Sequence, residues 1–349
     1  MSRVLVTGGA GAIGGAIVRR LLADPAYEVR VSDRRLAPQW MREGAEVHEG
    51  DLRVAREARA ALDGCTHVIH LGGLDDDAHD AEARPFTLME AESAVCSTMV
   101  GAAVAPGAEV ERFVYVSSAA VFERASEFPT SEAYLAECPT PESPYGFAML
   151  AGEMYCRAAD EEHGLQYTIC RLFDAYGPTI GPSATPDVPC ARKRAPESAS
   201  ALNDLIMSVL AGETTPRVEG AEEHTRTPTH MDDIASGVIA SMGTPKAVNE
   251  DFNIAAAREL TVAEIVRIVW ETCGEDPESL ATEPLLTATG PLPMATGPLP
   301  TDTVEARRSW PSVEKARRLL GWEARIEAEE GIAATVEWIR ARGSVGSAP

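Results

Sequence analysis

Lysine, like positive charge in general, is scarce in this chain of 349 residues. Only three lysines occur, at positions 193, 246 and 315, and 31 Lys and Arg stand against 54 Asp and Glu, which leaves a formal net charge of -23. Because such a surface repels a polyanion, we expect no nucleic-acid partner. A phosphate-bearing ligand needs a local site that overcomes the negative field.

Long hydrophobic runs and paired cysteines are also missing. No apolar stretch is long enough to cross a bilayer, and the first residues lack the pattern of a signal peptide, so we expect no membrane partner. The seven cysteines are odd in number, widely spread and never spaced as Cys-x-x-Cys, which gives no support to a zinc or dithiol site. We therefore predict no bound metal, and free thiols in a cytoplasmic protein.

Short apolar runs alternate with helical patterns through the first half of the chain. This alternation is typical of a parallel sheet covered by helices on both faces. Right-handed crossovers then predict an α/β fold with a doubly wound parallel sheet, the Rossmann type. Strands are predicted at residues 4–7, 27–32, 47–48, 66–71, 112–117 and 166–172, and helices at 13–23, 53–62, 86–105 and 144–163.

Two segments of the second half have the composition of long loops. Residues 178–200 are rich in Pro, Ala and Ser and contain the basic triplet 192–194, which we interpret as solvated, with phosphate binding as the alternative. The sequence Ala-Thr-Gly-Pro-Leu-Pro occurs at 288–293 and again at 295–300, which indicates a loop near 285–305 expanded by duplication.

Helical patterns return around these loops and define a second part of the chain. We predict a nucleotide-binding domain over residues 1–176 and a smaller C-terminal α/β lobe for the substrate over residues 177–349. The later helices are predicted at 203–211, 232–242, 261–273, 312–320 and 329–342.

A glycine-rich turn, Thr7-Gly-Gly-Ala-Gly-Ala-Ile-Gly14, follows the first predicted strand and opens the first predicted helix. Gly8 allows the tight turn, Gly11 lets the backbone approach a pyrophosphate, and Gly14 lets helix and strand pack closely. The helix start, with Ala12 and Ile13, supplies free N–H groups and the positive end of the helix dipole. The sequence therefore predicts a dinucleotide site, the local site that an acidic protein needs.

Asp33 closes the second predicted strand and stands where the ribose of such a dinucleotide would bind. Its carboxylate can accept hydrogen bonds from both ribose hydroxyls, which favours NAD over NADP. Arg34 and Arg35 follow directly and could bind a 2′-phosphate, so NADP is the alternative.

Asp51 and Leu52 follow the third predicted strand. The Asp51 carboxylate is placed to meet the amino group of adenine. The alternative is an N-cap for the helix predicted from Arg53.

These and further motifs together resemble the extended short-chain dehydrogenase/reductase family, in its branch of nucleotide-sugar epimerases and dehydratases. They run in the family's order from residue 3 to about residue 340. The matching segments are Thr7–Gly14, Asp33, Asp51-Leu52, His70–Gly73, Val114–Phe122, Ser143–Gly146, Arg171–Pro178, Arg226–Asp233 and Leu320–Trp322.

The resemblance implies hydride transfer between a sugar carbinol and NAD, with Tyr145 taking the hydroxyl proton and Ser118 bonding the same oxygen. In the family a lysine four residues after the tyrosine binds the nicotinamide ribose and lowers the tyrosine pKa. Positions i and i+4 share one helix face, so both groups meet the same cofactor. Here that position is Met149, which has neither charge nor donor. The resemblance also implies cofactor contacts from Leu71, Gly72, Gly73, Ser117 and Tyr145.

For the substrate, the resemblance implies contacts from Ser118, Tyr145, Asp174 and Arg226. Arg226 matches an arginine that grips the sugar-nucleotide pyrophosphate; a plain surface salt bridge is the alternative. Asp174 stands where the family usually carries an asparagine that helps to hold the substrate phosphate. A carboxylate there repels a diphosphate unless it is paired.

The two residues after Ser118 limit the reactions that the resemblance implies. They are Ala119 and Ala120, where 4,6-dehydratases of the family carry an Asp-Glu pair. Oxidation and reduction at one carbon remain, which favours an epimerase or oxidoreductase acting at C4 of a UDP- or dTDP-hexose through a transient keto-sugar. One alternative is a catalytically impaired homologue that binds NAD as a sensor or partner protein, and another is a dehydrogenase of a small hydroxy acid or amino acid. A homodimer through the two long helices, residues 86–105 and 144–163, is expected from the family.

Overall fold

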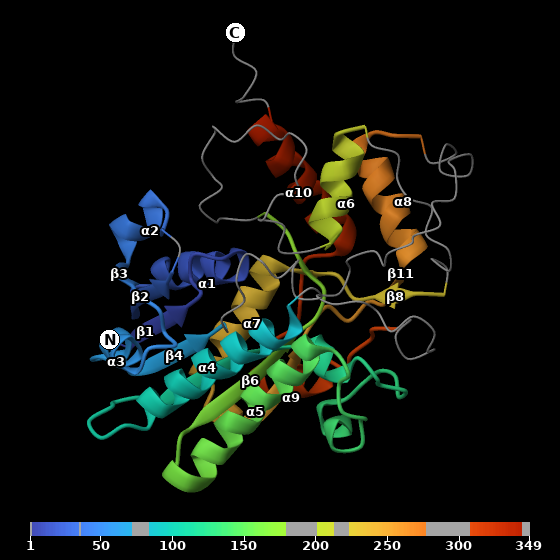
Figure 1. Ribbon diagram of the computed structural model, residues 1–349. Helices are drawn as coiled ribbons and strands as arrows, with labels where there is room; N and C mark the ends of the chain where they lie inside the picture. The colour runs from blue at the N-terminus through green and yellow to red at the C-terminus, as the bar shows by residue number, and fades with distance from the viewer. Residues whose placement is uncertain are drawn as a thin grey trace.

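The computed structural model describes residues 2–34, 36–71, 84–178, 201–212, 223–276 and 308–343. Within them, seven strands form one parallel sheet in the order β10-β6-β5-β4-β1-β2-β3 (Figure 1). The strands are β1 (Ser2–Thr7), β2 (Tyr27–Asp33), β3 (Glu46–Glu49), β4 (His67–His70), β5 (Arg112–Ser118), β6 (Tyr167–Leu172) and β10 (Glu250–Ile254).

The central strands are apolar along their whole length because both of their faces are covered. Val4, Leu5 and Val6 of β1 are all fully buried, although they alternate between the two faces of the sheet. In the register of β1 and β2, Val4 lies opposite Val29 and Val6 opposite Val31. These valines pack on one face, whereas Leu5 packs on the other.

Helices cover both faces, as predicted for a doubly wound sheet. One face packs against α1 and α7, and the other against α3, α4 and α5. A short helix, α2, precedes β3, and α9 packs against β10. The helices are α1 (Ala12–Leu22), α2 (Gln39–Gly44), α3 (Ala55–Leu62), α4 (Pro85–Ala103), α5 (Pro144–His163), α7 (Met231–Gly243) and α9 (Glu314–Leu320).

A separate hydrophobic cluster joins three helices that lie beyond one end of the sheet (Figure 1). They are α6 (Ala201–Leu210), α8 (Val262–Cys273) and α10 (Ala328–Gly343). Helix α8 begins with a capping box in which Thr261 and Glu264 satisfy each other's backbone N–H groups. Two further ladders each have two short strands. One pairs β7 (Ala175–Tyr176) with β9 (Thr229–His230), and the other pairs β8 (Thr225–Arg226) with β11 (Leu260–Thr261).

The boundary at residues 176 and 177 stays a prediction, but the sheet itself draws on both parts of the chain. Strand β10 and helix α7 come from the second part and complete the edge and one face of the sheet. Strand β10 was not predicted, because its sequence, Glu-Asp-Phe-Asn-Ile, has no run of apolar residues. The loops expected near 178–200 and 285–305, including the basic triplet and the duplicated segment, lie outside the described residues apart from Pro178.

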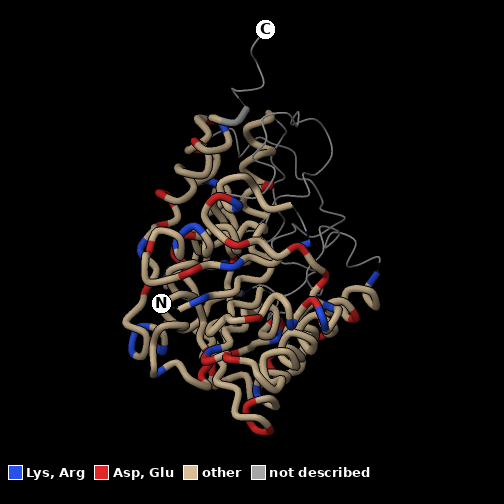
Figure 2. The backbone as a smooth tube through the Cα atoms, turned by 90° about the vertical axis from the view of Figure 1, so that its left-hand side faces the viewer, with Lys and Arg blue, Asp and Glu red and all other residues tan. Residues whose placement is uncertain are grey.

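Charges of both signs are scattered over the described backbone and are not sorted into separate halves (Figure 2). None of the described helices is long and apolar enough to span a bilayer.

Candidate active site at the carboxyl ends of the strands

Many of the predicted site residues lie where strands of the parallel sheet end, which is one edge of the sheet. The strand order reverses direction between β1 and β4, and ligands of open α/β sheets bind at such a switch point. Thr7, Asp33, His70 and Ser118 are each at or next to the last residue of their strand. The topology thus brings together residues that are more than a hundred positions apart.

The glycine turn has the geometry that its sequence predicts. Gly8 takes a positive φ of 64° and donates its N–H to the carbonyl of Ser32 at 2.8 Å. A Cβ at Gly14 would lie 2.2 Å from the carbonyl oxygen of Gly8, so the helix can approach the turn only with glycine there. Gly11 is the N-cap of α1 and offers no side-chain cap, which leaves the first N–H groups of the helix to a ligand.

Asp33 lies against this turn, because its Oδ2 accepts a hydrogen bond from the N–H of Ala10 at 3.0 Å. The carboxylate therefore stands beside the glycine turn, where a ribose next to a pyrophosphate would lie. Arg34 follows at the surface end of β2.

Asp51 is engaged by its neighbour, and Leu52 is buried in the core. The Asp51 carboxylate accepts from the main-chain N–H of Arg53 at 3.0 Å and from its guanidinium, with Nη2 to Oδ2 at 2.6 Å. The side-chain hydrogen bond from Arg53 lowers the pKa of Asp51. The alternative of an N-cap is wrong, because α3 begins later than predicted and its N-cap is Val54. Asp51 closes the turn before the helix instead, and its contact with adenine stays a prediction.

Thr7 and His70 tie the ends of β1 and β4 together. Thr7 Oγ1 is 2.7 Å from His70 Nδ1 and also accepts the N–H of Leu71 at 3.3 Å. Full burial lowers the pKa of His70 to about 4, so the imidazole is neutral at pH 7. Gly72 and Gly73 lie outside the described residues.

The segments that carry Ser118 and Tyr145 are in direct contact. Ser118 caps a short 3-10 helix, η2 (Ala119–Phe122), and accepts the N–H of Ala120 at 3.2 Å. Tyr145 is the second residue of α5, which packs on η2. A Cβ at Gly146 would lie 2.7 Å from the carbonyl oxygen of Ala120, so glycine permits this close approach.

Met149 is buried at 3% exposure and packs in an apolar cluster with Val121, Phe122 and Phe173. The hydroxyl of Tyr115 lies 3.8 Å from its sulfur and 3.5 Å from its carbonyl oxygen. The position at which the resemblance implies a lysine is therefore filled by a well-packed apolar side chain.

Ser117 does not direct its side chain toward a ligand, since its hydroxyl donates to Glu153 at 2.8 Å within a buried network. Arg171 forms a two-pronged pair with Glu153, at 2.8 and 2.7 Å, and also bonds Asp251 at 2.8 Å. Burial raises the pKa of Asp251, but Arg171 and Lys315 outweigh it and bring the pKa to about 2. A cofactor contact from Ser117 would have to come from its main chain.

Asp174 and Arg226, the two residues expected at the substrate phosphates, lie next to each other. Asp174 has a positive φ of 38° and accepts the N–H of Thr227 at 2.9 Å. Arg226 is 4% exposed and donates to the carbonyl of Thr225 at 2.6 Å. Burial raises the pKa of Asp174, while Arg226 acts in the opposite direction.

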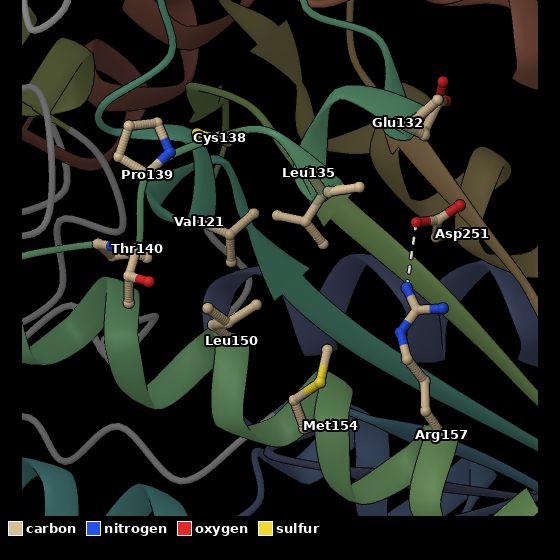
Figure 3. A pocket seen from close by; sticks show the side chains of 13 residues that line it. Val121, Glu132, Leu135, Cys138, Pro139, Thr140, Leu150, Met154, Arg157 and Asp251 are labelled. Atoms are coloured by element: carbon tan, nitrogen blue, oxygen red, sulfur yellow. Dashed lines mark hydrogen bonds and ion pairs between the residues drawn. The ribbon is translucent and has the colours of Figure 1, made fainter. Parts of the chain in front are cut away.

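A cavity of about 510 Å³ lies beside α5, between that helix and the 3-10 helix η3 (Glu132–Ala136) with the loop after it. Leu150, Met154 and Arg157 project into it from α5 (Figure 3). Arg157 Nη2 is 3.2 Å from Asp251 Oδ2 at its polar end, so these charges are already paired with each other. No group of three or more potential metal ligands occurs within the described ranges.

Known proteins resemble the chain over nearly its whole length. UDP-glucose 4-epimerase of Mycolicibacterium smegmatis is 27% identical over 347 residues, which span 97% of this chain and 98% of that protein. The crystal structure of UDP-glucose 4-epimerase with UDP-glucose from Thermotoga maritima matches with a TM-score of 0.78 at 26% identity, over 97% and 99% of the two chains. A dTDP-glucose 4,6-dehydratase structure from Streptomyces venezuelae, the DesIV double mutant with NAD bound, matches with a TM-score of 0.75 at 25% identity, over 97% of both chains.

The model of the NAD dependent epimerase/dehydratase family matches residues 4–255, well over half of the chain. The match confirms the resemblance inferred from the motifs, and it confirms the expected cofactor at the level of the family, which is NAD dependent by its description. By its sequence and its Rossmann sheet, the chain belongs to the NAD dependent epimerase/dehydratase family.

Proposed function

We propose that this protein binds NAD and oxidises and reduces C4 of a UDP- or dTDP-hexose through a transient keto-sugar, as an epimerase or oxidoreductase. The observation that carries the proposal is the contact between the Ser118 turn and the first turn of α5, at the same edge of the sheet as the glycine turn. The names of the similar proteins, among them two UDP-glucose 4-epimerases, support this reading.

The cofactor would lie across the carboxyl ends of the strands. The start of α1, with Gly11, Ala12 and Ile13, would hold its pyrophosphate, and Asp33 its adenosine ribose. Bound NAD supplies a hydride acceptor for the sugar carbinol. An unesterified ribose suits the acceptor-only carboxylate of Asp33 better than a 2′-phosphate does.

Tyr145 would take the proton of the reacting hydroxyl, and the Ser118 hydroxyl would bond the same oxygen. A tyrosine titrates near pH 10 unless a cation lowers its pKa, and Met149 supplies no charge. Residue 149 therefore contributes nothing to lowering the tyrosine pKa, and we propose that the rate rises toward alkaline pH.

Arg226, with Asp174 beside it, would meet the substrate diphosphate. Because the carboxylate offsets part of the arginine charge, this end of the site attracts phosphate less strongly than an arginine with an amide neighbour would. The hexose itself would lie nearer to Tyr145 and Ser118.

One observation favours a second function, an NAD-binding homologue without turnover. Met149 is packed among apolar side chains, so its position is adapted to an uncharged residue. Such a protein would keep the cofactor site and serve as a sensor or a partner of other proteins.

A single experiment separates the two functions. The protein is mixed with NAD and UDP-glucose, UDP-galactose or dTDP-glucose between pH 7 and pH 10, and nicotinamide absorbance and sugar products are followed. The enzyme predicts transient NADH or a converted sugar that is lost in Tyr145→Phe, a variant that keeps the ring and removes the hydroxyl. Tight NAD binding without product at any of these pH values would reject the enzyme and support the sensor.

The proposal also includes a homodimer in the cytoplasm. Helices α4 and α5 pack side by side and expose Phe86, Phe147, Met154 and Tyr155. Exposed apolar side chains on adjacent helices are typical of a protein interface. The six described cysteines form no disulfide, which suits a reducing compartment.

A further inference from the structure

Glu123 occupies an unusual place between the two segments that carry Ser118 and Tyr145. It follows η2 directly as its C-cap, and its side chain reaches across to the chain just before α5. The Glu123 carboxylate accepts the N–H of Ser143 at 2.7 Å, and it also accepts the N–H of Glu142 and the hydroxyl of Ser143. One carboxylate thus gathers three donors from the residues that lead into the helix.

Ser143 connects the Glu123 carboxylate to the start of α5. Its hydroxyl donates to Glu123 and accepts the N–H of Gly146 at 2.9 Å, so its one hydrogen and a lone pair are both used. Ser143 is the N-cap of α5, and Tyr145 lies between the cap and the residue that the cap binds. The position of the first turn of α5 is therefore tied to Glu123.

The main chain of Glu123 is linked to Ser118 through Ala120. The N–H of Glu123 donates to the carbonyl of Ala120 at 3.2 Å, and the N–H of Ala120 donates to the Ser118 hydroxyl at 3.2 Å. Gly146 packs against that Ala120 carbonyl. Hydrogen bonds and one close backbone contact thus form a closed loop that links Ser118 to the helix of Tyr145.

From this geometry we infer that Glu123 is a positioning residue, which sets the distance and angle between Ser118 and Tyr145 for the reaction; the inference rests on the proposed function. A carboxylate only accepts hydrogen bonds, and charged acceptors hold donors more firmly than neutral ones. Misplacement of a reacting group by about 1 Å can cost on the order of a hundredfold in rate.

The test compares Glu123→Ala and Glu123→Gln with the wild-type protein. Alanine removes all three acceptor contacts, whereas glutamine keeps an acceptor oxygen for the two N–H groups and gives up the acceptor for the Ser143 hydroxyl. We expect kcat to fall by roughly ten- to a hundredfold in the alanine variant and by only about threefold in the glutamine variant. The KM for the sugar nucleotide and the Kd for NAD should stay within about twofold, because the glycine turn and Arg226 are on other segments.

A matched control separates positioning from general stability. Gly164 ends the same helix with a positive φ of 73°, so Gly164→Ala strains the far end of α5 without touching the site. This variant should lower Tm while its kcat stays unchanged. An equal loss of kcat in Gly164→Ala and Glu123→Ala, or no loss in Glu123→Ala, would overturn the positioning role.

Hydrogen exchange provides a readout that does not depend on turnover. The amides of residues 142–146 should exchange faster in Glu123→Ala than in the wild type, with Glu123→Gln between them. Unchanged exchange in Glu123→Ala would overturn the positioning role of Glu123 even in an active enzyme. If the wild type shows no turnover and Glu123→Ala still speeds the exchange of these amides, the proposed function is rejected. The hydrogen bonds by which Glu123 holds the start of α5 are then still supported.

Discussion

Oδ1 of Asp174 lies 4.0 Å from Nε of Arg226, and both side chains are almost completely buried. The resemblance to the family implies that both lie at the substrate phosphates, where Arg226 would attract phosphate and Asp174 would repel it. The structure pairs them at this distance, so each charge is partly offset by the other.

Asp174→Asn should tighten the binding of UDP. Asparagine keeps an acceptor for the N–H of Thr227 and tolerates the positive φ of this residue, while it leaves the Arg226 charge free for phosphate. We expect the Kd to fall by about three- to tenfold, the equivalent of roughly 0.7–1.4 kcal/mol, in isothermal titration. Arg226→Gln is the control and should weaken binding; equal affinities of wild type and Asp174→Asn would contradict the role of the pair.

Met149→Lys should raise turnover at neutral pH and move the pH profile toward neutrality. A lysine at this position would share a helix face with Tyr145 and lower its pKa, as a nearby cation does. We expect kcat at pH 7 to rise by at least about tenfold, since each unit of tyrosine pKa changes the phenolate fraction tenfold. Met149→Leu keeps an apolar side chain and should behave like the wild type. A further fall in kcat in the lysine variant would mean that the site is adapted to methionine.

Gly14→Ala should abolish tight binding of NAD. The new Cβ would lie 2.2 Å from the Gly8 carbonyl oxygen and 2.7 Å from the Gly9 Cα, and these backbone atoms can only move with the turn. We expect the Kd measured by fluorescence titration to rise by about ten- to a hundredfold, or ~1.4–3 kcal/mol. Gly101→Ala is the control, because nothing lies within 4 Å of its added Cβ in α4; it should leave the Kd unchanged and raise Tm slightly.

Stability should decrease as the pH falls from about 6.5 to about 4. Burial lowers the pKa of His70 from 6.5 to about 4, so the unfolded chain binds a proton in this range that the folded protein does not. His70 thereby accounts for a loss of about 3 kcal/mol, which urea denaturation at several pH values would measure. In His70→Gln this part of the pH dependence should vanish, whereas His163→Gln, at the exposed end of α5, should retain it. The same pH slope in His70→Gln and in the wild type would contradict the assignment.

Met154→Glu should convert a dimer into a monomer. Met154 is 46% exposed on α5, next to Tyr155 at 39%, and a carboxylate introduced into an apolar interface is costly to bury. Sedimentation velocity at micromolar concentration should show a dimer for the wild type and a monomer for the variant. Glu162→Gln, a polar change at the exposed end of the same helix, should remain dimeric. A monomeric wild type would contradict the proposed interface.

Much of the fold and part of the site follow from local patterns in the sequence. The alternation of strands and helices predicts the sheet because a parallel sheet needs apolar strands and covering helices. The turn Thr7–Gly14 and the place of Asp33 at a strand end predict their own geometry, since glycine alone permits the positive φ and the close approach that the structure contains. Resemblance to the family identifies Ser118, Tyr145 and Met149 by position.

Contacts between distant segments were decided only by the tertiary structure. The pairing of Asp174 with Arg226, the engagement of Ser117 by Glu153 and the capture of Ser143 by Glu123 join residues 20 to 52 positions apart. Strand β10 joins the sheet because Phe252 and Ile254 find a buried edge beside β6, although its sequence carries no strand pattern. The sequence by itself determined which chemical groups the strand ends carry. The tertiary structure decided which of these groups bond each other, because hydrogen bonds and ion pairs depend on distances that the order of residues does not contain.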